Sequence, residues 1–109
     1  MPKQNGPSEK QITDNIRKYL SIKNIWHWKQ WQGPMSQPRG VADIIGIYRG
    51  RMLAIEVKKP GGILSDFQQR FLENVNKRGG IGFVAFSVDD VIRVIDGIEK
   101  LIEEKRQSA

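Results

Sequence analysis

The sequence of 109 residues contains no cysteine and a single histidine, His27. Without cysteine, the chain can form no disulfide, no thiolate zinc site and no iron–sulfur cluster. It also has no apolar run near the ~20 residues that a transmembrane helix needs. Residues 1–10 lack the apolar stretch of a secretory signal peptide. We therefore expect a cytoplasmic protein with no membrane partner.

Acidic residues are scarce over most of the chain. Residues 1–86 hold fourteen of the eighteen Lys and Arg, but six of the twelve Asp and Glu, and the formal net charge is +6. Such a basic balance indicates an anionic partner such as nucleic acid. The length and the 39% hydrophobic content predict one folded domain over residues 1–109.

The hydrophobic pattern predicts an α/β fold in the order αβββαβα, with a mixed four-stranded sheet flanked by helices. The expected helices follow the N-caps Ser8, Ser65 and Ser87, and the first two caps belong to capping boxes closed by Gln11 and Gln68. The expected strands cover residues 25–31, 41–48, 52–58 and 81–86, with a loop at 32–40. The last strand is nearly all apolar, which predicts that both of its faces are covered. We place the core at about 8–95 and a C-terminal helix extension at 96–105.

A hairpin with Arg49 and Gly50 as its two-residue turn brings two carboxylates together. In that register, opposed residue numbers sum to 99, so Asp43 lies directly across from Glu56. Lys58 follows two residues later on the same face, because side chains alternate along a strand. The register thus predicts two carboxylates and an ammonium group at one end of the sheet.

The two opposed carboxylates, Asp43 and Glu56, form what we call the carboxylate pair. Their β-carbons should lie ~5 Å apart. Like charges at ~4 Å repel by about 4 kcal/mol at an effective dielectric of 20, so the pair needs a counter-charge. Lys58 can supply one, which is the purely structural interpretation. A divalent cation supplies more, and oxygen ligands without His or Cys favour Mg²⁺, with Mn²⁺ as a substitute.

The residues Gly40-Val41-Ala42-Asp43, twelve intervening positions and Glu56-Val57-Lys58 resemble the active-site signature of the PD-(D/E)XK nuclease superfamily. With Glu9 upstream and Gln68 after the hairpin, the chain is most similar to the VRR-NUC family, over about residues 8–95. The resemblance implies a restriction-endonuclease-like core and metal-dependent hydrolysis of DNA phosphodiester bonds. Ala42 departs from the family, which usually has proline before the aspartate.

The resemblance also implies roles for individual residues. Asp43, Glu56 and the backbone carbonyl of Val57 would bind the metal, and Lys58 would orient the attacking water and stabilise the developing charge. Glu9 would complete the outer shell or bind a second metal. Gln68 would hold the water, Lys58 or a phosphate, although its place in a capping box explains it equally well.

Glu9 and the basic residues carry further expectations. The spacing to Ile12 and Ile16 places Glu9 at the head of the apolar stripe of its helix, so we expect it to point inward; a first-turn Glu that only favours the helix dipole is the alternative. The candidate DNA-binding residues are Arg39, Gly40, Arg49, Arg51, Lys59, Lys77 and Arg78.

We interpret the tryptophans and the single histidine as structural residues. At least two of Trp26, Trp28 and Trp31 are expected to be core or subunit-interface anchors, because exposed Trp is costly. Stacking on bases is the alternative. His27 has no evident orienting partner for catalysis, so we interpret it as structural.

Together these features predict a Mg²⁺-dependent structure-specific DNA endonuclease that resolves four-way (Holliday) junctions as a homodimer. One domain offers one site, and paired cuts on opposing strands need two sites related by a two-fold axis. The alternatives are a flap, fork or nicking nuclease of the same fold, and a non-catalytic basic module that binds nucleic acid. A sequence-specific restriction enzyme is disfavoured because little of the chain is spare for reading base edges.

Overall fold

The computed structural model describes residues 6–34 and 38–108, so residues 35–37 of the expected 32–40 loop lie outside the described residues. Its elements follow the predicted order αβββαβα. The three helices are α1 (Glu9–Ile22), α2 (Asp66–Lys77) and α3 (Val88–Gln107). The four strands are β1 (His27–Lys29), β2 (Ile44–Tyr48), β3 (Arg51–Val57) and β4 (Ile81–Ala85).

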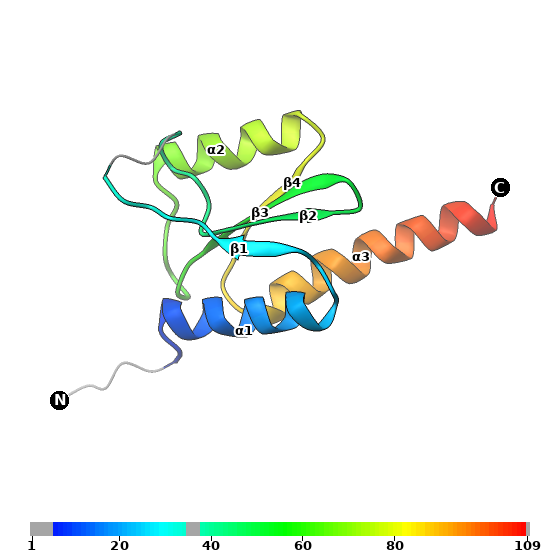
Figure 1. The fold of residues 1–109 in the computed structure, drawn as a ribbon, viewed down its shortest axis with the longest axis horizontal. Helices are drawn as coiled ribbons and strands as arrows, with labels where there is room; N and C mark the ends of the chain where they lie inside the picture. The colour runs from blue at the N-terminus through cyan, green and yellow to red at the C-terminus, as the bar shows by residue number, and fades with distance from the viewer. Residues whose placement is uncertain (1–5, 35–37, 109) are drawn as a thin grey trace.

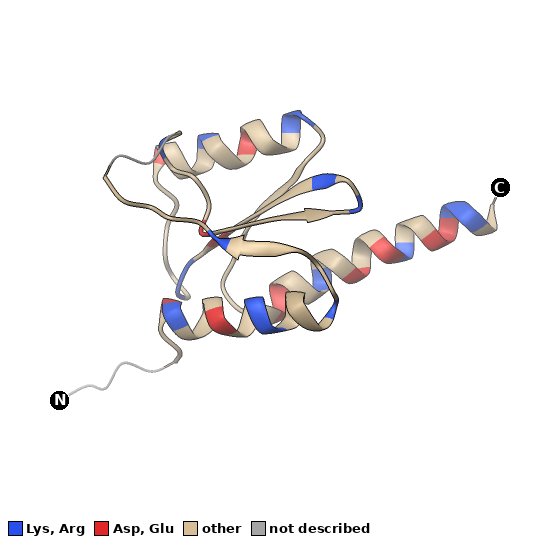
Figure 2. Ribbon diagram, viewed as in Figure 1, with Lys and Arg blue, Asp and Glu red and all other residues tan. Residues whose placement is uncertain are grey.

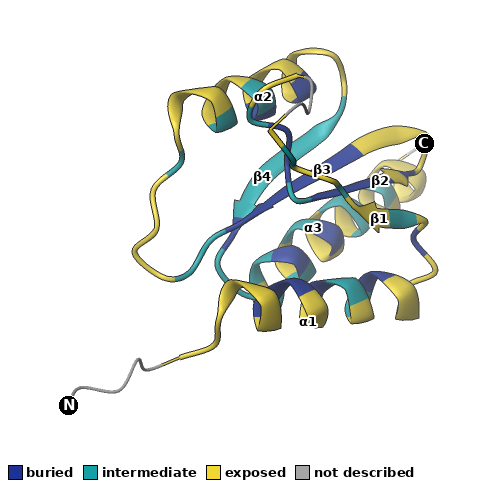
Figure 3. Ribbon diagram, turned by 60° about the vertical axis from the view of Figure 1, so that its left-hand side comes forward, coloured by how far each residue is buried: buried dark blue, intermediate teal, exposed yellow. Residues whose placement is uncertain are grey.

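The four strands form one sheet in the spatial order β1-β2-β3-β4, which confirms the mixed sheet (Figure 1). β2 pairs antiparallel with both β1 and β3, and β4 runs parallel to β3. Helix α2 covers one face, where Leu72 and Val75 pack on Ala54. Helices α1 and α3 cover the other face, where the larger core cluster lies (Figure 3).

The helix starts follow from local hydrogen bonding. In both predicted capping boxes the serine hydroxyl accepts from the N3 backbone N–H, and the N3 glutamine side chain accepts from the serine N–H. These bonds satisfy amide groups that a helix otherwise leaves unpaired. Ser87 precedes α3 but makes no such side-chain bond. There, Asp90 Oδ2 accepts from the backbone N–H of Phe86 at 2.8 Å.

The predicted hairpin register is confirmed from the turn to the pair Ile44–Ile55, and each opposed pair sums to 99. Arg49 and Gly50 at the turn have φ values of 51° and 78°, as a tight primed turn requires. The β2–β3 ladder stops at Ile44, the residue after Asp43, so the carboxylate pair lies just beyond this ladder. The register therefore positions the candidate site at the end of the hairpin opposite the turn.

Three strands differ from expectation. β2 begins at Ile44 rather than at residue 41, so Asp43 precedes the strand instead of lying within it. β1 is shorter than the predicted 25–31, because the preceding residues end α1: Ile25 N–H donates to Leu20 O, and Asn24 has a φ of 59°. β4 is half-buried rather than covered on both faces, because it is an outer strand that pairs with β3 alone. Among the described residues, no helix is long and apolar enough to cross a membrane.

The C-terminal part of α3 extends beyond the sheet (Figure 1). Its first half packs into the core through Val91 and Ile95. Its second half carries mixed charge (Figure 2) and the exposed Leu101. This extension therefore contributes little to the core that positions the site.

Gly40 lies in the loop before β2 and packs against the backbone at the start of α2. Its φ is +75°, and a Cβ there would lie 2.3 Å from the backbone carbonyl carbon of Phe67. Gly61 has a similar φ of +87°, but a Cβ on Gly61 would meet no atom within 4 Å. The two glycines thus share the left-handed backbone, but only Gly40 makes a close approach.

We predict that Gly40→Ala destabilises the fold by ~2 kcal/mol or more, while Gly61→Ala costs about 1 kcal/mol from backbone strain alone. The difference is the backbone clash with α2. Urea denaturation of both variants measures it. Equal losses of unfolding free energy in the two variants would contradict a packing role for Gly40.

Candidate active site

The carboxylate pair forms at the end of the hairpin, where the β2–β3 ladder stops. Asp43 precedes β2, and its Oδ2 accepts a hydrogen bond from the backbone N–H of Val57 at 2.7 Å. On the other side, the backbone carbonyl of Asp43 accepts from the N–H of Gln30 at 2.8 Å. The Asp43 carboxylate thus replaces a backbone acceptor and ties the two strands together beyond their last pair.

Glu56 is the most unusual side chain in the described structure. It is 2% exposed, whereas Glu is almost never fully buried without a partner. Its Oε2 accepts from Gln68 Nε2 at 3.0 Å and lies 3.7 Å from Lys58 Nζ. Its Oε1 is buried with no hydrogen-bond partner. An orphaned carboxylate oxygen is costly, which points to a ligand that this side chain receives from outside the chain.

Gln68 completes the predicted capping box and also contacts the carboxylate pair, while its role toward water, Lys58 or a phosphate stays a prediction. Its Oε1 accepts from the backbone N–H of Ser65 at 2.9 Å and completes the capping box. Its Nε2 donates to Glu56 at the same time. The first turn of α2 is thereby fixed to the carboxylate pair, because the amide oxygen of Gln68 bonds to Ser65 and its amide nitrogen bonds to Glu56.

Lys58 follows β3 and lies beside Glu56, with a side chain that is 17% exposed. A Cβ on Gly62 would lie 3.1 Å from Lys58 Cβ, so the absence of a side chain at Gly62 leaves room for the lysine stem. The ammonium group is therefore held near the pair by packing as well as by charge.

The environment raises the pKa of Glu56 from its ordinary 4.5 to about 8. Burial is the largest cause, followed by the negative charge of Asp43 and a side-chain interaction with it. Lys58 acts in the opposite direction and offsets only part of this. Near neutral pH, Glu56 therefore holds a proton that a bound cation would displace.

The donor set fits a hard divalent cation. The carboxylate pair offers oxygen ligands only, and none of the described residues beside it is His or Cys, which suits Mg²⁺ or Mn²⁺ rather than zinc. Over residues 6–34 and 38–108, no group of three or more His, Cys, Asp or Glu could hold a metal. Two carboxylates are nevertheless enough for Mg²⁺, which keeps water and substrate phosphate as its other ligands.

The structure does not bring Glu9 into this cluster. Glu9 is the first residue of α1 and is exposed, so the expected inward orientation is wrong. It belongs to no three-carboxylate group within the described part of the chain. The apolar stripe begins at Ile12, one turn later, because the first turn extends past the core. A role for Glu9 in metal binding stays a prediction.

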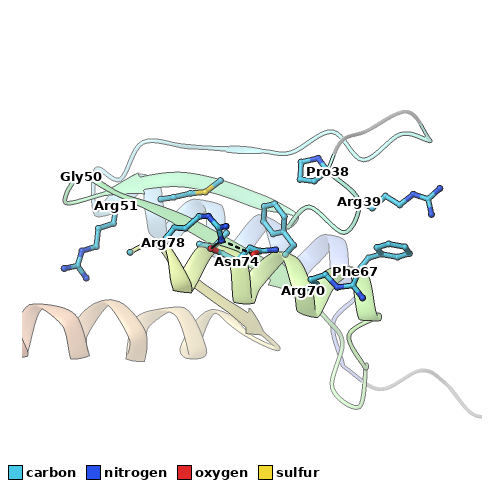
Figure 4. Close-up of a pocket in the computed structure, with 13 residues that line it drawn as sticks. Pro38, Arg39, Gly50, Arg51, Phe67, Arg70, Asn74 and Arg78 are labelled. Atoms are coloured by element: carbon cyan, nitrogen blue, oxygen red, sulfur yellow. Dashed lines mark hydrogen bonds between the residues drawn. The ribbon is translucent and has the colours of Figure 1, made fainter.

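The candidate DNA-binding residues lie in four places. Arg39, Arg51 and Arg78 line a groove of about 520 Å³ between α2 and the hairpin, together with Arg70 (Figure 4). We call it the arginine groove. Arg49 lies over the ring of Tyr48, 5.6 Å from its centroid. Gly40 and Lys59 flank the carboxylate pair in sequence, and Lys77 is exposed at the end of α2.

Arg70 and Phe67 are residues of this groove that the sequence analysis missed. Both lie on α2, where the helical spacing of Phe67 to Phe71 and Leu72 predicts that Phe67 faces the core. Phe67 is instead 44% exposed. The spacing of Phe67, Arg70 and Arg78 on one helix could have indicated a shared basic and aromatic face.

The three tryptophans are exposed, so the interpretation as core anchors is wrong. Trp26 is 70% and Trp31 is 62% exposed, and the ring centroids of Trp26 and Trp28 are 5.1 Å apart. β1 is the outer strand, and two of these rings flank it rather than lie in it. His27 has a structural contact, since its Nδ1 lies 2.8 Å from Ile25 O.

Comparison with known proteins assigns the fold. No family model matches the sequence, and no curated protein matches it. A solved structure described as "VRR_NUC domain protein" superposes with a TM-score of 0.70 at 23% identity, covering 86% of this chain and 89% of that chain. The chain therefore has a VRR-NUC fold, as its resemblance in sequence implied.

The buried carboxyl predicts a specific pH dependence of stability. Because the folded state keeps a proton on Glu56 that the unfolded state loses above its ordinary pKa of 4.5, Glu56 costs ~1.4 kcal/mol of unfolding free energy per pH unit between about pH 5 and 8. Glu56→Gln should remove this slope and be more stable than the wild type at pH 8. Urea denaturation in EDTA from pH 5 to 8 measures both.

Glu73→Gln is the matched control, because Glu73 is an exposed carboxylate on α2. It should keep the wild-type slope. If Glu56→Gln and the wild type lost stability in parallel as the pH rose, the raised pKa of Glu56 would be refuted.

Proposed function

We propose that the protein is a metal-dependent endonuclease that hydrolyses phosphodiester bonds in branched DNA. The observation that carries this proposal is the buried Glu56 carboxyl, with its orphaned Oε1, beside Asp43 and Lys58 at the end of the sheet. Most buried carboxyl oxygens of structural charge pairs have a hydrogen-bond partner, and Oε1 of Glu56 has none. The VRR-NUC fold supports the same class of activity.

Each residue of the site has a defined task in this proposal. Asp43, Glu56 and the backbone carbonyl of Val57 would hold Mg²⁺ or Mn²⁺. When bound, the cation polarises the phosphate and lowers the pKa of a coordinated water. Gln68 keeps the Glu56 carboxyl oriented through its 3.0 Å hydrogen bond. Lys58 places a positive charge where negative charge develops on the phosphate during attack.

The proposed substrate is DNA recognised by its shape. The net charge of +6 favours a polyanion, and Lys and Arg follow α2 and the hairpin turn (Figure 2). Over the described residues, the hairpin, α2 and the loops around them leave no separate element for reading base edges in the major groove. Selectivity for a branch point, with the four-way junction as the first candidate, fits this layout.

We further propose that the active form is a homodimer, because resolving a four-way junction takes two matched cuts. Two exposed apolar side chains support an interface between two copies of the chain. Trp26, just before β1, is 70% exposed. Leu101, in the C-terminal extension of α3, is 60% exposed. Burying either of them against a second copy would remove apolar surface from water.

The nuclease proposal predicts cleavage that depends on the carboxylate pair. With Mg²⁺, wild-type protein should cut branched DNA in a panel of linear, flap, fork and four-way substrates, and EDTA should stop it. Asp43→Asn and Glu56→Gln should lower the rate by ~10³-fold or more, because each removes a metal ligand. Lys58→Ala should lose most of the rate but still bind Mn²⁺.

Binding of the same substrates in EDTA is the control, since all three variants should retain it. Cleavage by the wild type in excess EDTA would sink the metal-dependent mechanism. Binding without cleavage under any divalent cation would favour the non-catalytic module instead.

The dimer proposal predicts a mass of twice 12.5 kDa by light scattering at micromolar concentration. Leu101→Glu should reduce the mass to that of one chain and replace paired cuts by single nicks. Ile22→Glu, at another exposed apolar position, is the control and should stay dimeric. A wild-type monomer that cuts flaps but not junctions would instead identify a flap nuclease.

A further inference from the structure

The arginine groove is a second feature of the same face, separate from the carboxylate pair. It lies between α2 and the hairpin, and its volume of about 520 Å³ is within the range of pockets that enclose small ligands. Its floor is apolar and includes Met52 and Phe71. Figure 4 shows Arg39, Arg70 and Phe67 near one end of α2 and Arg51 near the hairpin turn.

The positive charge of the arginine groove is not balanced by acidic residues. No described Asp or Glu lines it, and none of the ion pairs formed by the described residues involves its four arginines. Arg78 is held in place, since its Nη1 donates to Asn74 Oδ1 at 2.9 Å. Four arginines without acidic partners around an apolar floor favour a ligand that is anionic and also has apolar faces.

Phe67 is the aromatic element of the groove. Guanidinium carbons of Arg39 and Arg70 lie 5.2 and 5.8 Å from the centroid of its ring, within the range of cation–π contacts. Its backbone is fixed by the close approach of Gly40. The exposed part of the ring offers a surface on which a base can stack, next to two groups that can bind phosphate.

We propose that the arginine groove binds an unpaired DNA strand, with a base stacked on Phe67 and phosphates on the guanidinium groups. Duplex DNA would present its phosphates but keep its base faces stacked inside the helix, so it would leave the apolar floor empty. An unpaired strand offers both surfaces at once. This inference rests on the proposed nuclease function and names the substrate feature that the enzyme recognises.

The groove adjoins a second hollow that reaches Gln68, a hydrogen-bond partner of the carboxylate pair. This hollow of about 340 Å³ shares Arg39 and Phe67 with the groove and is also lined by Gln68. Gln68 donates to Glu56. A strand leaving the carboxylate pair would thus pass Phe67 and follow α2 towards the hairpin turn. The 12 residues of α2 extend ~18 Å, or about five nucleotides of a stacked strand.

This path connects the groove to branched substrates, because strands unpair at a branch point. The carboxylate pair would act on the backbone where the duplex ends, while the groove holds the strand that has separated. Forks and junctions with an unpaired stretch at the branch should then bind more tightly than fully paired DNA.

Binding without cleavage tests this proposal directly. Fluorescence anisotropy in EDTA compares a labelled strand of about 12 thymidine nucleotides with a blunt duplex of the same length. Phe67→Ala should weaken binding of the single strand by about 5- to 100-fold, as expected for one lost base stack, and change duplex binding little. Phe67→Trp should retain single-strand affinity. The double variant Arg70→Gln/Arg78→Gln should lower the salt slope of single-strand binding by about 1.4.

Lys100→Gln is the control for loss of a positive charge outside the groove, because Lys100 is exposed on α3, across the sheet from the groove. It should leave single-strand binding unchanged, and thermal melting should show that every variant is folded. Wild-type affinity in Phe67→Ala, or equal losses in the groove variants and Lys100→Gln, would overturn the proposal. Because the assay contains no divalent cation, its result does not depend on cleavage. If the protein cleaves DNA but its affinity for a single strand does not depend on Phe67, only the proposal about the groove is refuted.

Discussion

The candidate site depends on one costly arrangement: the Glu56 carboxyl, 2% exposed, beside Asp43 at the end of the hairpin. Its burial raises the pKa of Glu56 to about 8, and its Oε1 has no hydrogen-bond partner. Carboxyls with such a perturbed pKa cluster at functional sites. The strand register, the capping box of α2 and the packing of Lys58 all serve to hold this carboxyl in place.

The start of α2 connects the candidate active site to the proposed DNA-binding groove. Gln68 belongs to the first turn of α2 and contacts Glu56, while Phe67, its neighbour, lies at the start of the arginine groove. The close approach of Gly40 fixes that turn against the loop before Asp43. The start of α2 is thus a shared support for the carboxyl that would bind the cation and for the surface that would hold the strand.

Local signals in the sequence predicted much of this. The two-residue turn set the register, so the meeting of Asp43 and Glu56 followed from counting residues. The capping box predicted the start of α2, and from that position Gln68 also contacts Glu56. The positions that failed depend on tertiary placement. Glu9 lies on a turn that extends past the core, and the exposure of Phe67 depends on how α2 meets the hairpin.

The most direct test of the account is calorimetric titration of the protein with Mn²⁺ or Mg²⁺ near pH 7 in buffers of different ionisation enthalpy. The account predicts that binding requires Asp43 and Glu56 and releases about one proton per chain, because the cation displaces the proton that Glu56 holds. Glu56→Gln should neither bind the cation comparably nor release the proton. Absence of binding by the wild type, or binding that is unchanged in Glu56→Gln, would contradict the metal site on which the proposed function rests.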